Sequence, residues 1–115
     1  MRESNSSFMN GVPELLILTV LSDREMYGYE LLQEIHKRTQ AVVSLGEGVV
    51  YPILHGLEKS GALESRRMTV QGRSRVYYSV TPKGMTRLSD LSTTWSRLTS
   101  AIQQIIAGGS HVGTI

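Results

Sequence analysis

The sequence predicts a single α+β domain that is mostly helical, with three helices, then a β-hairpin, then one long helix. Two patterns lead to this prediction. Apolar residues recur at helical spacing in the first half and again after residue 81, whereas residues 62–80 alternate between polar and apolar. A chain of 115 residues can build one hydrophobic core, and a composition that is 40% hydrophobic and 19% charged is ordinary for a globular protein.

The first helix is predicted to begin at Pro13, because proline is favoured in the first turn of a helix. Residues 14–21 are apolar on nearly every side, so we expect this helix to be buried all round. The residues before it, 1–11, are polar and rich in serine and asparagine, and they are predicted to form a flexible arm.

Two more helices are predicted over residues 26–38 and 47–59, separated by a connector. Gly46 and Gly61 suit the two ends of the second of these helices, as a cap and as a stop signal. Pro52 is compatible with that helix because it falls in or just after the first turn. The apolar residues at helical spacing are Leu31, Leu32, Ile35, Val50, Ile53, Leu54 and Leu57.

A β-hairpin is predicted next, because residues 62–70 and 75–80 alternate in polarity on either side of residues 71–74, whose composition is typical of a turn. Thr81 then caps the last helix, and Pro82 opens it. The hairpin therefore lies between the third helix and the last.

The apolar residues of the last helix are separated alternately by three and four positions, which is the a/d pattern of a coiled coil. Over residues 82–106 this helix would be about 37 Å long, more than so small a body can cover. The stripe could pack against the chain's own first helix, but its narrowness favours a homodimer in which two such helices pair. The expected dimerisation residues are Leu88, Leu91, Trp95, Leu98, Ile102 and Ile105.

The formal net charge of +2 conceals an asymmetry between the two halves of the chain. Residues 1–58 carry four basic and eight acidic side chains, a net charge of −4, whereas residues 59–115 carry eight basic and two acidic ones, a net charge of +6. A basic second half in a small domain indicates a polyanionic partner, although a solvated surface would also explain it.

The order helix, connector, helix and hairpin is that of a winged helix-turn-helix, here over residues 12–80, with a dimerisation helix over 81–107 and a flexible tail over 108–115. In that arrangement the third helix enters the major groove of DNA, and the hairpin reaches phosphates or the minor groove. Alternatively, the tyrosine of the third helix packs against the hairpin, and the strand arginines are only solvated. The candidate DNA-binding residues are Gly48, Val49, Tyr51, Arg66, Arg67, Arg73 and Arg75.

Other functional classes find little support in the sequence. The absence of cysteine excludes disulfides and thiolate chemistry, and the three histidines lie far apart, so we expect no catalytic site, no metal and no cofactor. No Gly-rich loop follows a predicted strand. The longest apolar stretch, residues 15–21, is far shorter than the ~20 residues of a membrane helix, and the chain does not begin with a signal peptide. A cytoplasmic protein without membrane contact is expected.

Three segments of this sequence resemble the PadR family of transcriptional regulators: Tyr27–Leu31 (YGYEL), Gly48–Gly61 (GVVYPILHGLEKSG) and Arg73–Gly84 (RSRVYYSVTPKG). They occur in the expected order and spacing, and the match covers roughly residues 13–106. The chain is similar to the small branch of the family, which has one C-terminal helix. The resemblance implies a homodimeric repressor that leaves its operator when a signal arrives.

The same resemblance assigns roles to single residues. It places Tyr51 and its neighbours against DNA and Arg73 and Arg75 on the wing, and it implies that Gly28 allows close helix packing. This chain has Val49 where family members commonly have threonine, so it lacks a hydroxyl there but could touch a thymine methyl group.

Trp95 is the only tryptophan, and it lies midway along the apolar stripe of the last helix. A two-fold axis would bring it towards its mate, and two indole faces, with Leu91 and Leu98 beside them, would form a slot for a planar hydrophobic small molecule. The resemblance supports this interpretation, because some small PadR-like regulators sense such compounds. Trp95 could instead be a plain interface anchor. Two alternatives for the whole chain are a protein-interaction module and a small-molecule-binding dimer without DNA function.

Overall fold

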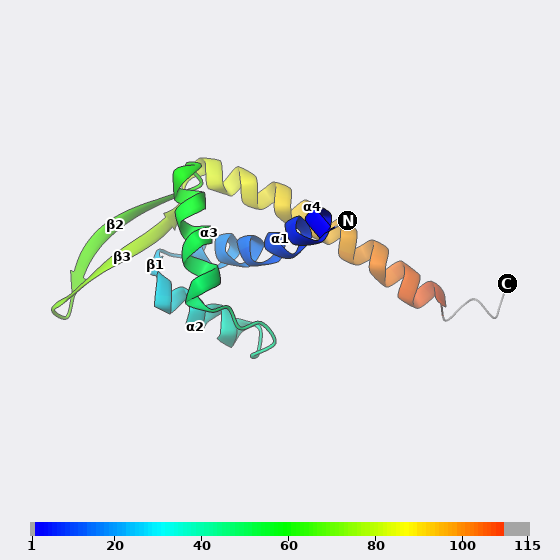
Figure 1. Ribbon diagram of the computed structural model, residues 1–115, viewed down its shortest axis with the longest axis horizontal. Coiled ribbons are helices and arrows are strands. Elements are labelled where there is room, and N and C mark those ends of the chain that lie inside the picture. Colours follow the sequence, from blue (N-terminus) through cyan, green and yellow to red (C-terminus); the bar gives the residue numbers. More distant parts are fainter. Residues whose placement is uncertain (1, 110–115) are drawn as a thin grey trace.

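The computed structural model of the chain describes residues 2–109 (Figure 1). It confirms the mostly helical fold with a hairpin before a long last helix. The elements, in chain order, are α1 (Arg2–Leu21), β1 (Met26–Tyr27), α2 (Gly28–Arg38), α3 (Glu47–Lys59), β2 (Leu63–Val70), β3 (Arg73–Val80) and α4 (Pro82–Gly109).

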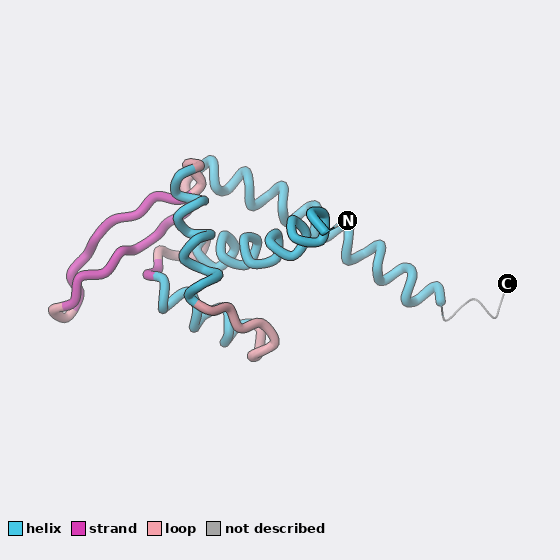
Figure 2. Tube along the Cα trace, viewed as in Figure 1, coloured by secondary structure: helices cyan, strands magenta, loops and turns pink. Residues whose placement is uncertain are grey.

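The molecule is elongated, with extents of 66 × 28 × 27 Å. Helices α1, α2 and α3 form a body, the hairpin β2–β3 projects from one side of it, and α4 runs from the base of the hairpin past α1 and onward (Figure 1). Figure 2 shows that the strands lie at one end and that the opposite end is a single helix. None of the helices within residues 2–109 has the length and hydropathy needed to cross a membrane.

The strands form an antiparallel sheet in the order β1-β3-β2. Strand β1 corrects the sequence prediction, which placed Met26 and Tyr27 in the second helix. Met26 pairs with Tyr78 and is fully buried, and Tyr27 pairs with Tyr77, so the helix begins only at Gly28. Pairing with a central strand outweighs the weak helical pattern at this position.

The hairpin turn is shorter than predicted. Gln71 and Gly72 both have positive φ, at 54° and 78°, which closes the hairpin in two residues. Val70 therefore pairs directly with Arg73, and β3 begins at Arg73 instead of residue 75. As a result, both arginines of this segment are strand residues at the tip of the wing, by which we mean the hairpin β2–β3.

Helix α1 also corrects the prediction, because it begins at Arg2 and not at Pro13. The backbone of residues 2–11 is thus helical, in the segment where a flexible arm was expected. At Gly11, α1 meets a neighbour that the local sequence does not reveal: a Cβ atom there would lie 3.5 Å from Nε1 of Trp95 in α4. The predicted tail, 108–115, lies outside the described residues except for its first two positions.

The core lies where α1, α2 and α3 meet the inner face of the sheet. The prediction that residues 14–21 are buried all round holds for Ile17, Leu18, Val20 and Leu21, whereas residues 14–16 are half-buried and Thr19 is exposed. The buried apolar residues are Ile17, Leu18, Val20, Leu21, Met26, Leu31, Ile35, Val50, Leu54, Leu57, Ala62, Leu63 and Tyr78.

The junction between the wing and α4 is tightly packed. Thr81 caps α4, since its Oγ1 accepts a hydrogen bond from the backbone N–H of Gly84 at 3.0 Å and donates one to the carbonyl of Gly61 at 2.5 Å. A Cβ atom on Gly84 would lie only 2.0 Å from the carbonyl oxygen of Ala62. The start of α4 is therefore fixed to the base of the wing.

Candidate nucleic-acid interface

Helix α3 presents one face to the core and the opposite face to solvent. Val50, Leu54 and Leu57 are buried and recur at helical spacing, so the opposite side of the helix points away from the body. The exposed residues of α3 on the side away from the core are Gly48, Val49, Pro52, His55, Gly56 and Lys59.

Tyr51 is half-buried and lies over the start of α2. A Cβ atom on Gly28 would come within 2.3 Å of the hydroxyl oxygen of Tyr51, so only glycine allows this contact. The expected role of Gly28 was to allow close packing of helices, and the contact it allows here is with a side chain of α3. The ring of Tyr51 also lies near that of His55, with centroids 6.2 Å apart. The side chain thus packs between α2 and α3. This position favours the alternative in which Tyr51 is a packing residue.

A concave surface lies between α3, the start of α2 and β3, with a volume of about 460 Å³. It combines aromatic rings with two cations: the guanidinium of Arg75 lies over the ring of Tyr27, 4.1 Å from its centroid, and Tyr27 meets Tyr77 edge to face at 5.5 Å. The functional groups around it come from Tyr27, Tyr29, Tyr51, His55, Arg73 and Arg75.

The arginines of the wing fall into two groups. Arg66 reaches across the sheet to Glu25 and donates two hydrogen bonds to its carboxylate, one of them from Nε at 3.0 Å. This pairing lowers the pKa of Glu25 and raises that of Arg66. Arg67 donates a hydrogen bond to Ser74 at 3.3 Å. Within the described chain no carboxylate lies within ion-pair distance of Arg73 or Arg75.

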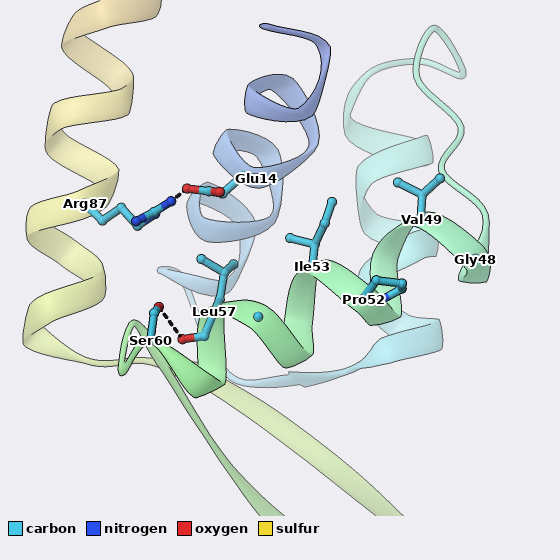
Figure 3. A pocket seen from close by; sticks show the side chains of 9 residues that line it. Glu14, Gly48, Val49, Pro52, Ile53, Leu57, Ser60 and Arg87 are labelled. Atoms are coloured by element: carbon cyan, nitrogen blue, oxygen red, sulfur yellow. Dashed lines mark hydrogen bonds and ion pairs between the residues drawn. The ribbon is translucent and has the colours of Figure 1, made fainter. Parts of the chain in front are cut away.

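A second hollow, of about 610 Å³, lies beside α3, and its lining includes Val49, Pro52 and Ile53 of α3 together with Glu14 of α1 and Arg87 of α4 (Figure 3). Its far wall is an ion pair between Glu14 of α1 and Arg87 of α4, which raises the pKa of Arg87. This ion pair links α4 to α1 directly above α3.

The apolar stripe of α4 is divided between two environments. Leu88 and Leu91 pack against the chain's own core. For this part of the stripe, the structure therefore agrees with the alternative in which α4 packs within its own chain. Trp95 and Leu98 are half-buried. By contrast, three residues near the end of the helix are exposed, to 45%, 76% and 63% of their surface: Ile102, Ile105 and Ile106.

Metal binding receives no support from the described part of the chain, where no three histidine, aspartate or glutamate side chains come together. His36 instead forms a hydrogen bond with Ser44 at 2.7 Å, which ties the end of α2 to the connector.

Sequence reasoning missed several residues of the interface. Tyr27 and Tyr29 lie at the concave surface, but the former was assigned to a helix, so its place beside Arg75 was not foreseen. Glu25 was not foreseen as the partner of Arg66, because 41 positions separate them. The exposed Ile106 extends the apolar stripe beyond Ile105. The run of apolar residues that continues after Ile105 could have predicted this extension.

Comparisons with known proteins agree with this arrangement. The model of the transcriptional regulator PadR-like family matches residues 17–90. The transcriptional regulator Rv3488 of Mycobacterium tuberculosis is 33% identical over 104 residues, which cover 90% of this chain and 92% of the relative.

A PadR-like transcriptional regulator from Bacillus cereus superimposes with a TM-score of 0.74 and 30% identity, over 87% of this chain and 96% of its own. A PadR-like transcription factor from Bacteroides fragilis does so with a TM-score of 0.74 and 27% identity, over 90% and 98%. These relatives are regulators, as the sequence led us to expect, and not enzymes. The chain is therefore a winged-helix member of the PadR-like family of transcriptional regulators.

Proposed function

We propose that this regulator is a homodimeric repressor that binds operator DNA and is released by a small planar hydrophobic effector. One observation carries the DNA-binding part: exposed His55 and half-buried Tyr51 of α3 border the same concave surface as the cations of Arg73 and Arg75, which have no carboxylate partner in the described chain. A duplex whose major groove receives α3 would bring its backbone phosphates to these two arginines.

The arginines of the wing contribute unequally in this proposal. Arg73 and Arg75 are available for phosphates, and the Tyr27 ring holds the Arg75 guanidinium in place. Arg66 already has a carboxylate partner in Glu25, and Arg67 is engaged with Ser74, so both are secondary contacts. Tyr51 acts with Gly48 and Val49 at the start of α3, where its ring sets the distance between the helix and the start of α2.

The homodimer is supported by the exposed end of α4. The last turns of α4 extend beyond the body, and three isoleucines lie on one side of them. They form an apolar surface that a second α4 would cover. Leu98 and Trp95 continue this surface towards the body, whereas Leu88 and Leu91 contribute by holding α4 on its own core. The pairing of the helices would fix the separation of the two α3 helices on DNA.

The effector part of the proposal concerns Trp95. Its indole lies between the packed and the exposed halves of α4 and faces Gly11 of α1. A flat molecule bound between two such indoles, beside Leu91 and Leu98, would favour a different crossing of the helices. It would release DNA only if it bound the two crossings unequally.

The test of DNA binding is an affinity series for duplex DNA at increasing salt. Arg73→Ala and Arg75→Ala should each weaken binding to all sequences and lower the slope of log affinity against log salt by about one unit. Arg97→Ala, which removes an exposed arginine of α4, is the matched control and should leave the slope unchanged. A wild-type chain that binds no duplex in a salt-sensitive manner would contradict the proposal and favour a protein-interaction module or a dimer that binds only small molecules.

The effector is tested separately, by tryptophan fluorescence in the absence of DNA. Naphthalene- and quinoline-sized aromatic compounds should quench or shift the emission of Trp95, and those that do so should also release DNA. A compound that releases DNA without changing this emission, and that still binds Trp95→Ala normally, would contradict the assigned site.

A further inference from the structure

We infer that α3 recognises DNA through the methyl groups of thymine, so that the half-sites of this regulator are A·T-rich where they face Val49 and Pro52. This inference rests on the proposed DNA binding and names the class of sequence that is bound. It follows from what the exposed face of α3 contains and from what it lacks.

The exposed face of α3 is poor in groups that hydrogen-bond to bases. Guanine is usually read by a bidentate arginine and adenine by a bidentate asparagine or glutamine. None of these residue types occurs in α3, and neither serine nor threonine does. Lys59 lies in the last turn, and His55 is the one side chain in the middle of the exposed face that could hydrogen-bond to a base.

The remaining polar side chains of α3 are directed elsewhere. The hydroxyl of Tyr51 lies over Gly28, at the start of α2. Glu58 accepts a hydrogen bond from Ser65 of β2 at 2.5 Å. Glu47 precedes the buried Val50 by three positions and so lies beside the core-facing side of the helix. A recognition helix of this composition cannot rely on hydrogen bonds for most of its selectivity.

Apolar contact is what the face offers instead. Val49 is 45% exposed, and Pro52 follows it on the same outward side. The C5-methyl of thymine is the apolar group that distinguishes bases in the major groove, and small aliphatic side chains are suited to contact it. Val49 and Pro52 can therefore select thymine without a hydrogen bond.

The glycines of this face remove the obstacle to close approach. A Cβ atom on Gly48 or Gly56 would meet nothing within 4 Å, so packing within the chain does not require glycine there. Glycine in a helix interior, as at Gly56, nevertheless destabilises the helix relative to alanine. The two positions flank Pro52 at intervals of four residues, and without side chains they let base edges approach the backbone beside Val49 and Pro52.

The experiment begins with duplexes selected from a random library by the full-length protein. Each thymine of the selected half-site is then replaced by deoxyuridine, which keeps every hydrogen-bonding group and removes only the methyl. We expect enrichment of thymine in the half-site, and an affinity loss of about fourfold for each contacted methyl.

A double-mutant cycle assigns the contact to its residue. Val49→Ala should weaken binding to the selected duplex by about threefold to tenfold. At the thymine that Val49 contacts, replacement by deoxyuridine should cause no further loss of affinity for this variant. Val42→Ala is the matched control, because Val42 is a valine in the connector that is 84% exposed and does not belong to α3. It should keep both the affinity and the response to deoxyuridine.

Two outcomes would overturn the inference, and they are distinguishable. Tight, sequence-selective binding that is unaffected by deoxyuridine at every position would overturn the reading of methyl groups and leave the proposed function intact. Failure to bind any duplex would overturn the proposed function and this inference with it.

Discussion

The two ends of the molecule are both free of the body, but they differ in chemistry. At one end the wing presents Arg73 and Arg75, without carboxylate partners in the described chain. At the other end α4 presents exposed Ile102, Ile105 and Ile106. A cationic end suits a polyanion, whereas an apolar end suits a second copy of the same surface. In the proposed function, DNA contact and dimerisation would therefore lie at opposite ends of the molecule, so that substitutions can separate them.

Between the two ends, α4 is fixed to the rest of the chain at several points. Thr81 and Gly84 join it to the base of the wing, and Arg87 joins it to Glu14 of α1. The start of α4 therefore belongs to the body, and the pairing proposed above would involve the part of the helix from Trp95 onward. If two α4 helices pair as proposed, this connection would let their pairing set the spacing of the two wings.

The largest effect is expected at the apolar end. Ile105→Glu places a charge in the proposed helix pairing and should weaken the dimer by about thirtyfold or more while each chain stays folded. Sedimentation should report a lower mass, and circular dichroism should report unchanged helicity. Ser100→Glu, on the opposite side of the same helix, should keep the mass of wild type. If the wild-type protein were a monomer, the proposed pairing through the exposed isoleucines of α4 would be wrong.

The next effect is expected at the junction between the two ends. Gly84→Ala brings a Cβ atom to 2.0 Å from the carbonyl oxygen of Ala62, so the backbone must shift. We expect the free energy of unfolding to fall by about 2 kcal/mol, measured by chemical denaturation. Gly108→Ala in the same helix meets nothing within 4 Å and should be neutral or slightly stabilising. Equal stability of the two variants would contradict the tight junction.

The smallest effect is expected at the cationic end. Glu25→Gln removes the carboxylate that pairs with Arg66. Because the hydrogen bond with Arg66 lowers the pKa of Glu25, its carboxylate is charged at neutral pH. The ion pair is lost only when the pH falls below the ordinary pKa of a glutamate and the carboxylate becomes protonated. The substitution should raise DNA affinity modestly and increase the salt slope by up to about one unit. A decrease in affinity would show that Arg66 needs Glu25 to be held in place.

Sequence patterns predicted the fold well where the signal was local. The helical repeats, the alternating strands and the cap at Thr81 each depend on neighbouring residues, and all appear in the structure. Strand β1 was missed, because two residues are too few to show a period. The helical backbone before Pro13 was missed, because the polar residues there show no helical period.

For the site, the sequence indicated which segments to examine but not how they divide their roles. It grouped Arg66 with Arg73 as candidates, and only the three-dimensional structure brings Glu25 to the former. It likewise treated the stripe of α4 as one surface, although Leu88 and Leu91 belong to the core and Ile105 does not. A residue pattern records which side chains are apolar, whereas tertiary packing decides which of them are covered.

The central claim is that two chains, paired through the ends of their α4 helices, bind one duplex with both wings. The most direct measurement is the mass of the complex between the full-length protein and a selected duplex, by native mass spectrometry. We expect two chains per duplex for wild type and a loss of this complex for Ile105→Glu. One chain per duplex at saturation, with full salt-sensitive affinity, would contradict the claim.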